Sequence, residues 1–319
     1  MPATSVSAPG KIILCGEHAV VYDQPAIAIP VLTLCTTTKI FAHPTQPKGE
    51  ILVKADVLRL AEKLDILPVD DPIRKTIELV KTYFSLESLP ACEIHIISTL
   101  PVAAGLGSSA SLSISIIRAL SEFIGHPLPP DQVNTLAFEA EKNYHTHPSG
   151  LDNTVITYEK PIYFQRGCPL EFLHIERPFQ FIVANTGITA STSEAVSGVR
   201  ERLQNDPEKY TTLFTQVGLI SQHVRKNLAS GSQKEIGELL TLNHRYLVEM
   251  GVSCSELDRF VEVSINSGAL GAKLSGGGLG GNMLALVTSD TTKKVEEALE
   301  KAGAKMIFKI ILPASKEGK

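Results

Sequence analysis

The sequence lacks several features that would place it in a special class of protein. It has no run of 18 or more apolar residues, so no segment is expected to span a membrane. Its first residues, MPATSVSAPGK, lack the charged start and apolar core of a secretory signal. Basic residues are not in excess, because the net charge is −4, and this argues against a general nucleic-acid-binding protein.

Cysteine is scarce and never closely paired. The five cysteines are Cys15, Cys35, Cys92, Cys168 and Cys254. An odd number of isolated cysteines indicates reduced thiols in a cytoplasmic protein, and it argues against a disulfide or zinc framework. The sequence also shows no internal repeat and no low-complexity tract.

What is present is enough chain for more than one domain. The 319 residues are 43% hydrophobic, which can fill a sizeable core. Turn residues and charges gather between residues 167 and 178, so we predict two domains, 1–175 and 176–319. Residues 4–41 alternate between strand-like runs and turns, and the polar, proline-containing stretch 42–50 is expected to be a loop.

Apolar periodicity predicts the other elements. Helices are expected over residues 57–64, 73–84, 112–124, 132–144, 207–228, 232–250, 255–267 and 291–302, with another that follows the polar cluster 189–194 and continues to residue 203. Strands are expected over residues 94–100, 154–158, 179–184, 283–287 and 306–312.

A stretch rich in glycine and serine, PVAAGLGSSAS at residues 101–111, leads from an expected strand into an expected helix. Gly105 and Gly107 lack a Cβ and let the backbone approach a ligand, while Ser108 and Ser109 lie where the helix begins. Free N–H groups and the positive end of the helix dipole favour a phosphate there. The stretch is neither a Walker loop nor a dinucleotide fingerprint, and such loops also join strands to helices without binding phosphate.

Polar residues interrupt apolar runs at two other places. Lys11, Glu17 and His18 stand among strand-like apolar residues, where they form either a solvated surface ion pair and a structural histidine or a binding site. Glu141 lies at the edge of the apolar stripe of helix 132–144, so it needs a cation, either a metal or a basic side chain. Asp152 follows a proline–glycine turn, where an aspartate is usually a local backbone acceptor.

A second glycine-rich stretch, SGGGLGG at residues 275–281, stands beside the apolar strand 283–287. A flexible linker rarely occupies that position, so we interpret the glycines as permitting close backbone approach.

Three stretches together resemble the GHMP kinases, the superfamily of galactokinases, homoserine kinases, mevalonate kinases and phosphomevalonate kinases. They are APGKIILCGEHAVVYDQPAIAIP (8–30), PVAAGLGSSAS (101–111) and KLSGGGLGGN (273–282). They occur in the family's order and at similar distances, so the resemblance covers nearly the whole chain. GKIILCGEHAVVY and HPSGLDN (147–153) are most similar to stretches of the mevalonate kinases.

The resemblance implies an α+β fold of two domains, an N-terminal α/β domain like a ribosomal protein and a C-terminal ferredoxin-like domain. It implies ATP-dependent phosphorylation of the 5-hydroxyl of (R)-mevalonate in isoprenoid synthesis, with ATP and Mg²⁺ as cofactors. The partners implied are these small molecules and a second copy in a homodimer, with no nucleic acid or membrane. Alternatives are another GHMP kinase, acting on phosphomevalonate, a regioisomeric position of mevalonate or a sugar, and a non-catalytic nucleotide sensor.

The resemblance also implies roles for individual residues. Asp152 matches the catalytic aspartate that accepts the substrate proton or orients its oxygen, and Lys11 matches the lysine paired with it. Ser109 and Glu141 match the magnesium ligands. Implied nucleotide contacts are Pro101, Ala104, Gly105, Leu106, Gly107, Ser108, Ser109 and Ala110. Implied substrate contacts are Glu17, His18, Ser149, Gly150, Asp152, Gly277 and Gly278.

Four residues depart from the family's pattern. Asn185 stands where a DTG stretch often has aspartate, and Ser193 replaces a basic residue, which puts one anion contact in doubt. Leu279 and Asn282 differ from the glycine and cysteine of GAGGGGC and are expected to alter packing behind the loop.

Overall fold

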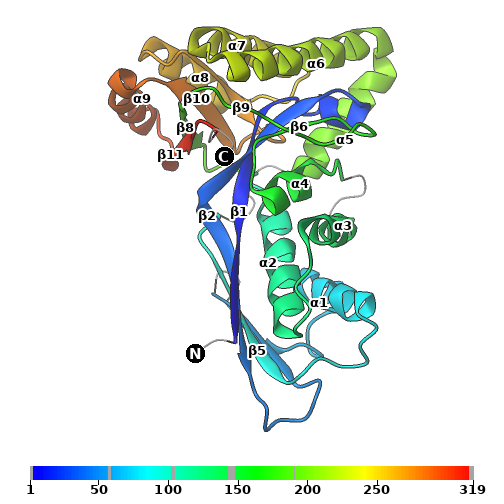
Figure 1. The fold of residues 1–319 in the computed structure, drawn as a ribbon. Coiled ribbons are helices and arrows are strands. Elements are labelled where there is room, and N and C mark those ends of the chain that lie inside the picture. Colours follow the sequence, from blue (N-terminus) through cyan, green and yellow to red (C-terminus); the bar gives the residue numbers. More distant parts are fainter. Residues whose placement is uncertain (1–2, 57–58, 102–104, 143–147, 190, 316–319) are drawn as a thin grey trace. The chain divides into compact units, whose positions relative to one another are not determined.

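The computed structural model describes residues 3–56, 59–101, 105–142, 148–189 and 191–315 (Figure 1). The chain divides into two compact units that are not consecutive halves. Unit 1 contains residues 1–11, 30–102 and 107–159, and unit 2 contains residues 12–29, 103–106 and 160–319. Strands β1 (Thr4–Cys15) and β2 (Ala26–Ala42) therefore contribute residues to both units. The expected family domains, 1–175 and 176–319, are a different kind of division and stay a prediction.

Unit 1 combines a β-sheet with helices on one side of it (Figure 1). Its strands follow the order β4 (Leu60–Lys63), β3 (Ile51–Ala55), β5 (Cys92–Ser98) and β2, and β1 also pairs with β2. Its helices are α1 (Pro72–Tyr83), α2 (Ser108–Phe123), α3 (Pro130–Glu141) and α4 (Leu151–Tyr158). Helix α2 is central, because it contacts α1, α3 and α4.

The expected helix 73–84 is confirmed, with clear local causes. Pro72 occupies the first turn, where its missing N–H costs nothing. The Asp71 side chain accepts hydrogen bonds from the backbone N–H groups of Ile73 and Arg74, at 2.9 and 3.0 Å. Ile77 and Val80 continue the buried stripe one and two turns later.

The expected helix 57–64 is wrong. Strand β4 occupies the described end of this segment and pairs antiparallel with β3, Leu52 facing Lys63 and Ala55 facing Leu60. Apolar residues at 60, 61 and 64 fit a helix by spacing, but only Leu64 of these is buried. The segment has too little apolar surface to bury as a helix, so pairing with β3 determines its conformation.

The expected strand 154–158 is also wrong, because these residues belong to helix α4. Gly150 precedes the helix in the left-handed conformation (φ 86°), and the Thr154 hydroxyl donates to the Gly150 carbonyl. Val155, Ile156 and Thr157 are buried, and a helix buried on most sides has the same continuous apolar run as a buried strand. The correction places Asp152 in the first turn of a helix, where the dipole favours a negative charge.

Unit 2 contains a four-stranded antiparallel sheet in the order β11–β8–β10–β9. In chain order these are β8 (Phe179–Asn185), β9 (Gly271–Ser275), β10 (Asn282–Val287) and β11 (Met306–Leu312). The order 4-1-3-2 is that of a ferredoxin-like domain, as the resemblance implied. Strand β9 was not among the expected strands. The short strand β6 (Ile162–Phe164) pairs with the first residues of β2, and β7 (Glu171–Phe172) pairs with β6.

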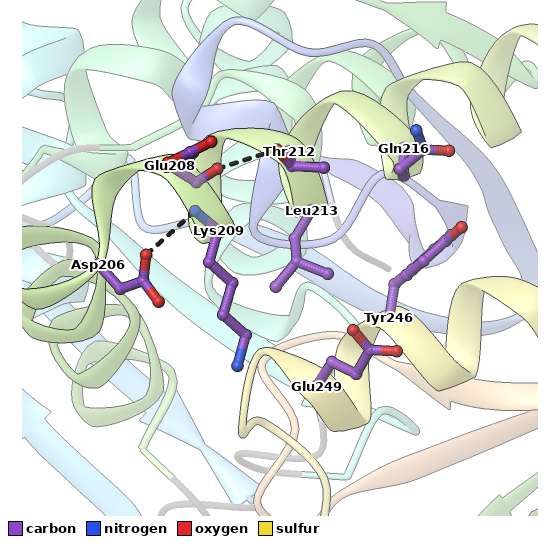
Figure 2. A pocket seen from close by; sticks show the side chains of 8 residues that line it. All are labelled: Asp206, Glu208, Lys209, Thr212, Leu213, Gln216, Tyr246 and Glu249. Atoms are coloured by element: carbon purple, nitrogen blue, oxygen red, sulfur yellow. Dashed lines mark hydrogen bonds between the residues drawn. The ribbon is translucent and has the colours of Figure 1, made fainter.

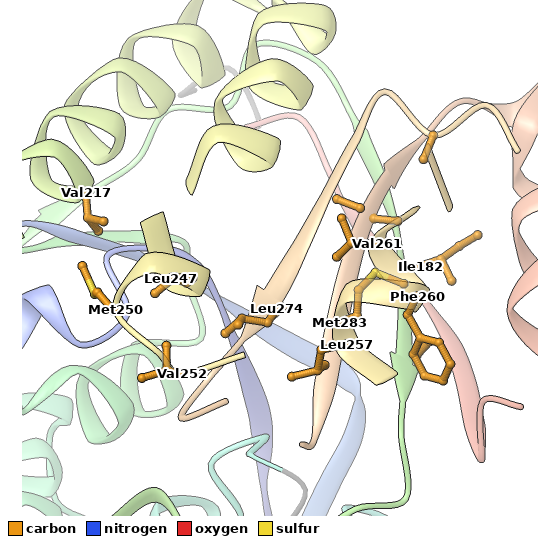
Figure 3. Packing of buried hydrophobic residues seen from close by; sticks show 14 of the residues in the cluster. Ile182, Val217, Leu247, Met250, Val252, Leu257, Phe260, Val261, Leu274 and Met283 are labelled. Carbon is orange, nitrogen blue, oxygen red and sulfur yellow. The ribbon is translucent and has the colours of Figure 1, made fainter. Parts of the chain in front are cut away.

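The helices of unit 2 agree with the expected ones to within two or three residues. They are α5 (Thr192–Asn205), α6 (Pro207–Ser230), α7 (Gln233–Glu249), α8 (Ser255–Asn266) and α9 (Ser289–Lys301). The 3-10 turn η1 (Ala19–Tyr22) was not among the expected helices. Helices α6 and α7 lie side by side (Figure 1). Figure 3 shows the core that the helices and the sheet bury, including Ile182, Leu257, Phe260, Leu274 and Met283.

Two expectations from the sequence, on the cysteines and on membrane-spanning segments, can be compared with the described residues. The five cysteines are free, and Cys15 and Cys92 are buried. Within the described ranges, no helix combines the length and the apolar character needed to cross a membrane.

Candidate active site

Lys11 and Asp152 form an ion pair in unit 1. The ammonium Nζ of Lys11, on β1, lies 3.0 Å from Oδ2 of Asp152, in the first turn of α4. The Lys11 side chain is only 5% exposed, whereas that of Asp152 is 31% exposed. The lysine of the pair is therefore buried, and its carboxylate is accessible to solvent. The alternative of a surface ion pair for Lys11 is wrong.

The second glycine of GLGSS packs directly against this pair. Gly107 has φ 74°, and a Cβ there would lie 2.9 Å from both Cγ of Lys11 and Cδ1 of Ile156. A side chain on residue 107 would collide with the aliphatic part of Lys11. Glycine therefore leaves the space that the lysine occupies. Helix α2 begins at the next residue, Ser108, and Gly107 has no side chain to cap its first N–H groups.

Ser109 and Glu141 lie beside the ion pair, from the start of α2 and the end of α3. The Ser109 side chain hydrogen-bonds the Glu141 carboxyl, whose pKa is raised to about 7, mainly by burial and further by the negative charge of Asp152. Glu141 is buried, as its position on the stripe predicted. A hydroxyl and a buried carboxylate are the hard oxygen donors that suit Mg²⁺, and a cation would relieve the two neighbouring negative charges.

A second polar group lies inside unit 2. Glu17 pairs with Lys273 of β9, and both side chains are 0% exposed. Lys273 also donates to the Leu274 carbonyl, and the Asn243 amide donates to Glu17 at 3.3 Å. The surface interpretation of Glu17 is wrong. The sequence analysis did not single out Lys273. The usable signal was a lysine between the apolar residues Ala272 and Leu274, directly before the glycine-rich stretch 275–281.

His18 follows Glu17 and connects it to the glycine-rich stretch 275–281. Its ring Nε2 lies 2.9 Å from the Gly277 carbonyl, so this nitrogen carries the proton and donates. The pKa of His18 is lowered to about 4, first by burial and then by the charges of Lys273 and Arg202. His18 is therefore neutral near pH 7. The geometry brings together two residues with implied substrate contacts, His18 and Gly277.

The glycine-rich stretch 275–281 adopts a conformation that requires its glycines. Gly276, Gly278, Gly280 and Gly281 all have positive φ, as does Leu279 (φ 58°). A Cβ on Gly278 would lie 1.9 Å from the Val252 carbonyl, which accepts a 2.8 Å hydrogen bond from Leu279 N–H. The loop is thus fixed against the turn after α7.

The two glycine stretches meet within unit 2, although they are far apart in the sequence. A Cβ on Gly276 would lie 3.8 Å from the carbonyl oxygen of Gly105. Gly105 itself has φ 72°. Backbone without side chains therefore lines both sides of this contact.

The remaining residues with implied contacts are known from their burial or from local hydrogen bonds. Leu106 and Ala110 are buried, whereas Pro101 and Ser108 are half-buried. The Ser149 hydroxyl accepts a 3.2 Å hydrogen bond from Leu151 N–H at the start of α4. Ala104 lies outside the described residues.

A hollow of about 620 Å³ lies elsewhere, between α6 and α7 (Figure 2). It is lined by Asp206, Glu208, Lys209, Thr212, Leu213, Gln216, Tyr246 and Glu249. None of the implied site residues belongs to it. Three carboxylates and one lysine give it a negative character, which does not suit a nucleotide phosphate.

Comparison with known proteins agrees with the motifs. The family model described as the GHMP kinases N terminal domain matches residues 71–160, and that described as GHMP kinases C terminal matches residues 224–305. The mevalonate kinase of Thermococcus sibiricus is 33% identical over 98% of this chain and 96% of its own length. The mevalonate kinase of Bos taurus is 30% identical over 93% and 89%.

Solved structures share the fold over nearly the whole chain. L. major mevalonate kinase in complex with R-mevalonate has a TM-score of 0.82 at 30% identity, with 99% of both chains covered. Methanococcus jannaschii mevalonate kinase has a TM-score of 0.85 at 25% identity, with 98% of both covered. Streptococcus pneumoniae phosphomevalonate kinase reaches 0.82 at 18% identity, over 96% of this chain and 100% of its own, which shows a common fold alone.

Proposed function

This chain belongs to the GHMP kinases, and from that premise and its site geometry we propose that it is a mevalonate kinase. It transfers the γ-phosphoryl group of ATP to the 5-hydroxyl of (R)-mevalonate. The observation that carries the proposal is the Lys11–Asp152 pair with Ser109 and Glu141 beside it. Phosphoryl transfer needs charge neutralisation, in-line positioning and an acceptor for the alcohol proton, and these four residues supply the groups for each.

In this proposal Asp152 orients the alcohol and accepts its proton as the bond to phosphorus forms. The Asp152 side chain is 31% exposed, which suits a group that must contact a substrate, whereas the Lys11 side chain is buried and held in place. The lysine balances the charge of Asp152 and the negative charge that grows on the transferred group. The start of α2, with the backbone of Gly107 before it, cradles the phosphates.

Mg²⁺ belongs to the proposal as the cation that Ser109 and Glu141 hold. When bound, Mg²⁺ would neutralise part of the negative charge of the phosphates. Burial and the charge of Asp152 raise the pKa of Glu141 to about 7. A cation beside it would oppose both effects, because a positive charge favours the ionised carboxylate.

The substrate contacts assigned to unit 2 are of two kinds. Gly277 and Gly278 offer backbone, and neutral His18 offers hydrogen bonding without positive charge. Glu17 faces Lys273 in the interior, so it acts on the substrate only through the position of β9 and the loop that follows.

The activity is tested with purified protein, ATP, Mg²⁺ and (R)-mevalonate by coupled detection of ADP. We expect mevalonate-dependent ADP release, and we expect Asp152→Asn to lower kcat at least a hundredfold while ATP affinity stays within about tenfold of the wild type. Release of ADP with phosphomevalonate or a sugar, but not with mevalonate, would favour another member of the family. An Asp152→Asn enzyme with unchanged kcat would contradict the role of Asp152.

A homodimer and a cytoplasmic location complete the proposal. Light scattering on the purified protein tests the first, and a monomeric mass at micromolar concentration would contradict it. Fractionation of cells tests the second.

A further inference from the structure

His18 has a backbone conformation that residues with a side chain rarely adopt. Its φ is 60° and its ψ is −44°, which lies outside the left-handed helical region that some non-glycine residues visit. The N–H of Ala19 donates to the carbonyl of Glu17 at 2.6 Å, so the three residues form a γ-turn centred on His18. A γ-turn with positive φ is rare and strained, and such strain persists only where surrounding contacts hold it.

The carboxylate of Glu17, directly before the centre of this turn, is bonded on both of its oxygens. The ammonium of Lys273 donates to Oε1, and Nδ2 of Asn243 donates to Oε2 at 3.3 Å. All three residues are buried. A carboxylate held in this way fixes the chain at residue 17, and its burial keeps it from direct contact with a ligand.

Lys273 is the fixed end of this arrangement, because it belongs to strand β9. It faces Leu284 of β10 in the antiparallel sheet. The other edge of β9 is held by α7, since the N–H of Leu274 donates to Nδ1 of His244 at 3.3 Å. The Lys273 ammonium also donates to the carbonyl of Leu274. One buried ammonium therefore connects Glu17 to the strand that leads into the glycine-rich stretch 275–281.

The side chain of His18 completes a closed ring of contacts. Its Nε2 donates to the carbonyl of Gly277 at 2.9 Å, and Gly277 follows Lys273 after a few residues of the same chain. The chain between Lys273 and Gly277 thus closes a ring that passes through Glu17 and the γ-turn. Because the ring is closed, the direction of the His18 side chain depends on the ion pair of Glu17 and Lys273.

We propose that Lys273 is a positioning residue for the alcohol substrate: through Glu17 it holds the strained turn that fixes the His18 ring against the glycine-rich stretch 275–281. The inference rests on the proposed function, because His18 and Gly277 are substrate contacts in that proposal. Stability alone does not require the two charges, since uncharged side chains of similar volume fill a protein interior equally well. The charges supply direction, because the ammonium holds the carboxylate at one place.

The double variant Glu17→Gln/Lys273→Met separates positioning from stability. It removes both charges together, so it keeps most of the stability that Lys273→Met loses, but the turn is no longer held. We expect the KM for mevalonate to rise at least tenfold and the KM for ATP to stay within twofold, by coupled detection of ADP. A merely structural pair would leave both values unchanged in the folded double variant. A KM for mevalonate within twofold of the wild type overturns the proposal.

The control is Ser264→Ala, which deletes a buried hydroxyl bonded to the Phe260 carbonyl at 2.7 Å in the same unit. It should leave both KM values within twofold. If circular dichroism shows that the double variant does not fold, Glu17→Asp replaces it, because a shorter carboxylate keeps the charge and loosens the turn. The same tenfold rise in the KM for mevalonate is then expected, and a value within twofold again overturns the proposal.

A second measurement needs no substrate. Glycine accepts a positive φ and alanine does not, so His18→Gly should have a higher urea midpoint than His18→Ala while the ion pair is intact. In the Glu17→Gln/Lys273→Met background the turn relaxes and the order should reverse, because alanine loses less conformational entropy on folding. An unchanged order in that background overturns the role of Lys273. A chain that does not phosphorylate mevalonate still gives this result, so the two proposals fail separately.

Discussion

At the scale of single residues, the buried pair of Glu17 and Lys273 links the start of the chain to the loop after β9. Both side chains are removed from water, and Asn243 and the Leu274 carbonyl supply further hydrogen bonds. Desolvation of two charges offsets much of their attraction, so the pair contributes little net stability. Loss of one partner is a different matter, because it leaves a buried charge uncompensated.

We predict that Lys273→Met lowers the free energy of unfolding by about 3–5 kcal/mol, whereas the double variant Glu17→Gln/Lys273→Met recovers most of this loss. Urea denaturation measures both. The exposed pair of Arg225 and Glu171 is the control, and Arg225→Met should cost less than about 1 kcal/mol. A double variant as unstable as Lys273→Met would show that the pair is not isolated from other charges.

At the scale of elements, the start of α2 depends on a glycine for two separate reasons. Gly107 has φ 74°, a conformation that residues with a Cβ rarely adopt, and it also leaves room for Lys11. Gly125, just beyond the end of the same helix, has φ 82° but nothing within 4 Å of a built Cβ. The two glycines therefore share the backbone requirement and differ in the space around them.

We predict that Gly107→Ala and Gly125→Ala each lose about 1–2 kcal/mol of stability through backbone strain. Only Gly107→Ala should also lower kcat, by at least tenfold, because its methyl group displaces Lys11 from Asp152. Thermal unfolding and steady-state kinetics on the two variants separate these effects. An equal loss of kcat in both variants would mean that helix stability, and not the lysine, limits activity.

Elements differ in how well the sequence predicts them. Helices α6 to α9 follow amphipathic stripes, and the side chains of Asp206 and Thr288 cap the starts of α6 and α9. The expected positions of all four helices are confirmed. Residues 57–64 and 154–158 were assigned wrongly because their apolar spacing fits more than one period. Pairing with β3 decides the first, and burial of α4 on most sides decides the second.

At the scale of the whole molecule, two buried histidines make stability depend on pH. The pKa of His18 and of His244 is lowered to about 4, chiefly by burial, with Lys273 lowering both and Asp258 opposing the shift at His244. His244 also accepts a 3.3 Å hydrogen bond from Leu274 N–H, which its protonation would break. In the unfolded chain these histidines bind protons near pH 6.5.

We therefore predict full stability above pH 6.5 and a progressive loss as the pH falls toward 4, because protons bind the unfolded chain first. Each histidine contributes on the order of 3 kcal/mol at the acid end. Urea denaturation at pH 7 and pH 5 measures the slope, and His244→Gln should flatten it. Exposed His223→Gln is the control for loss of a histidine. A slope unaffected by His244→Gln would assign the acid sensitivity to other groups.

The sequence by itself determined the family, the order of most elements, and the residue types needed for phosphoryl transfer, because glycine loops, capping residues and apolar stripes are local patterns. It also marked Lys11, Glu141 and Asp152 as polar residues that required an explanation. Their partners were not local. That Lys11 pairs with Asp152, that Glu17 pairs with Lys273 and that Asn185 donates a hydrogen bond to Asn282 was decided only by tertiary structure, since burial and charge compensation act between residues brought together by folding.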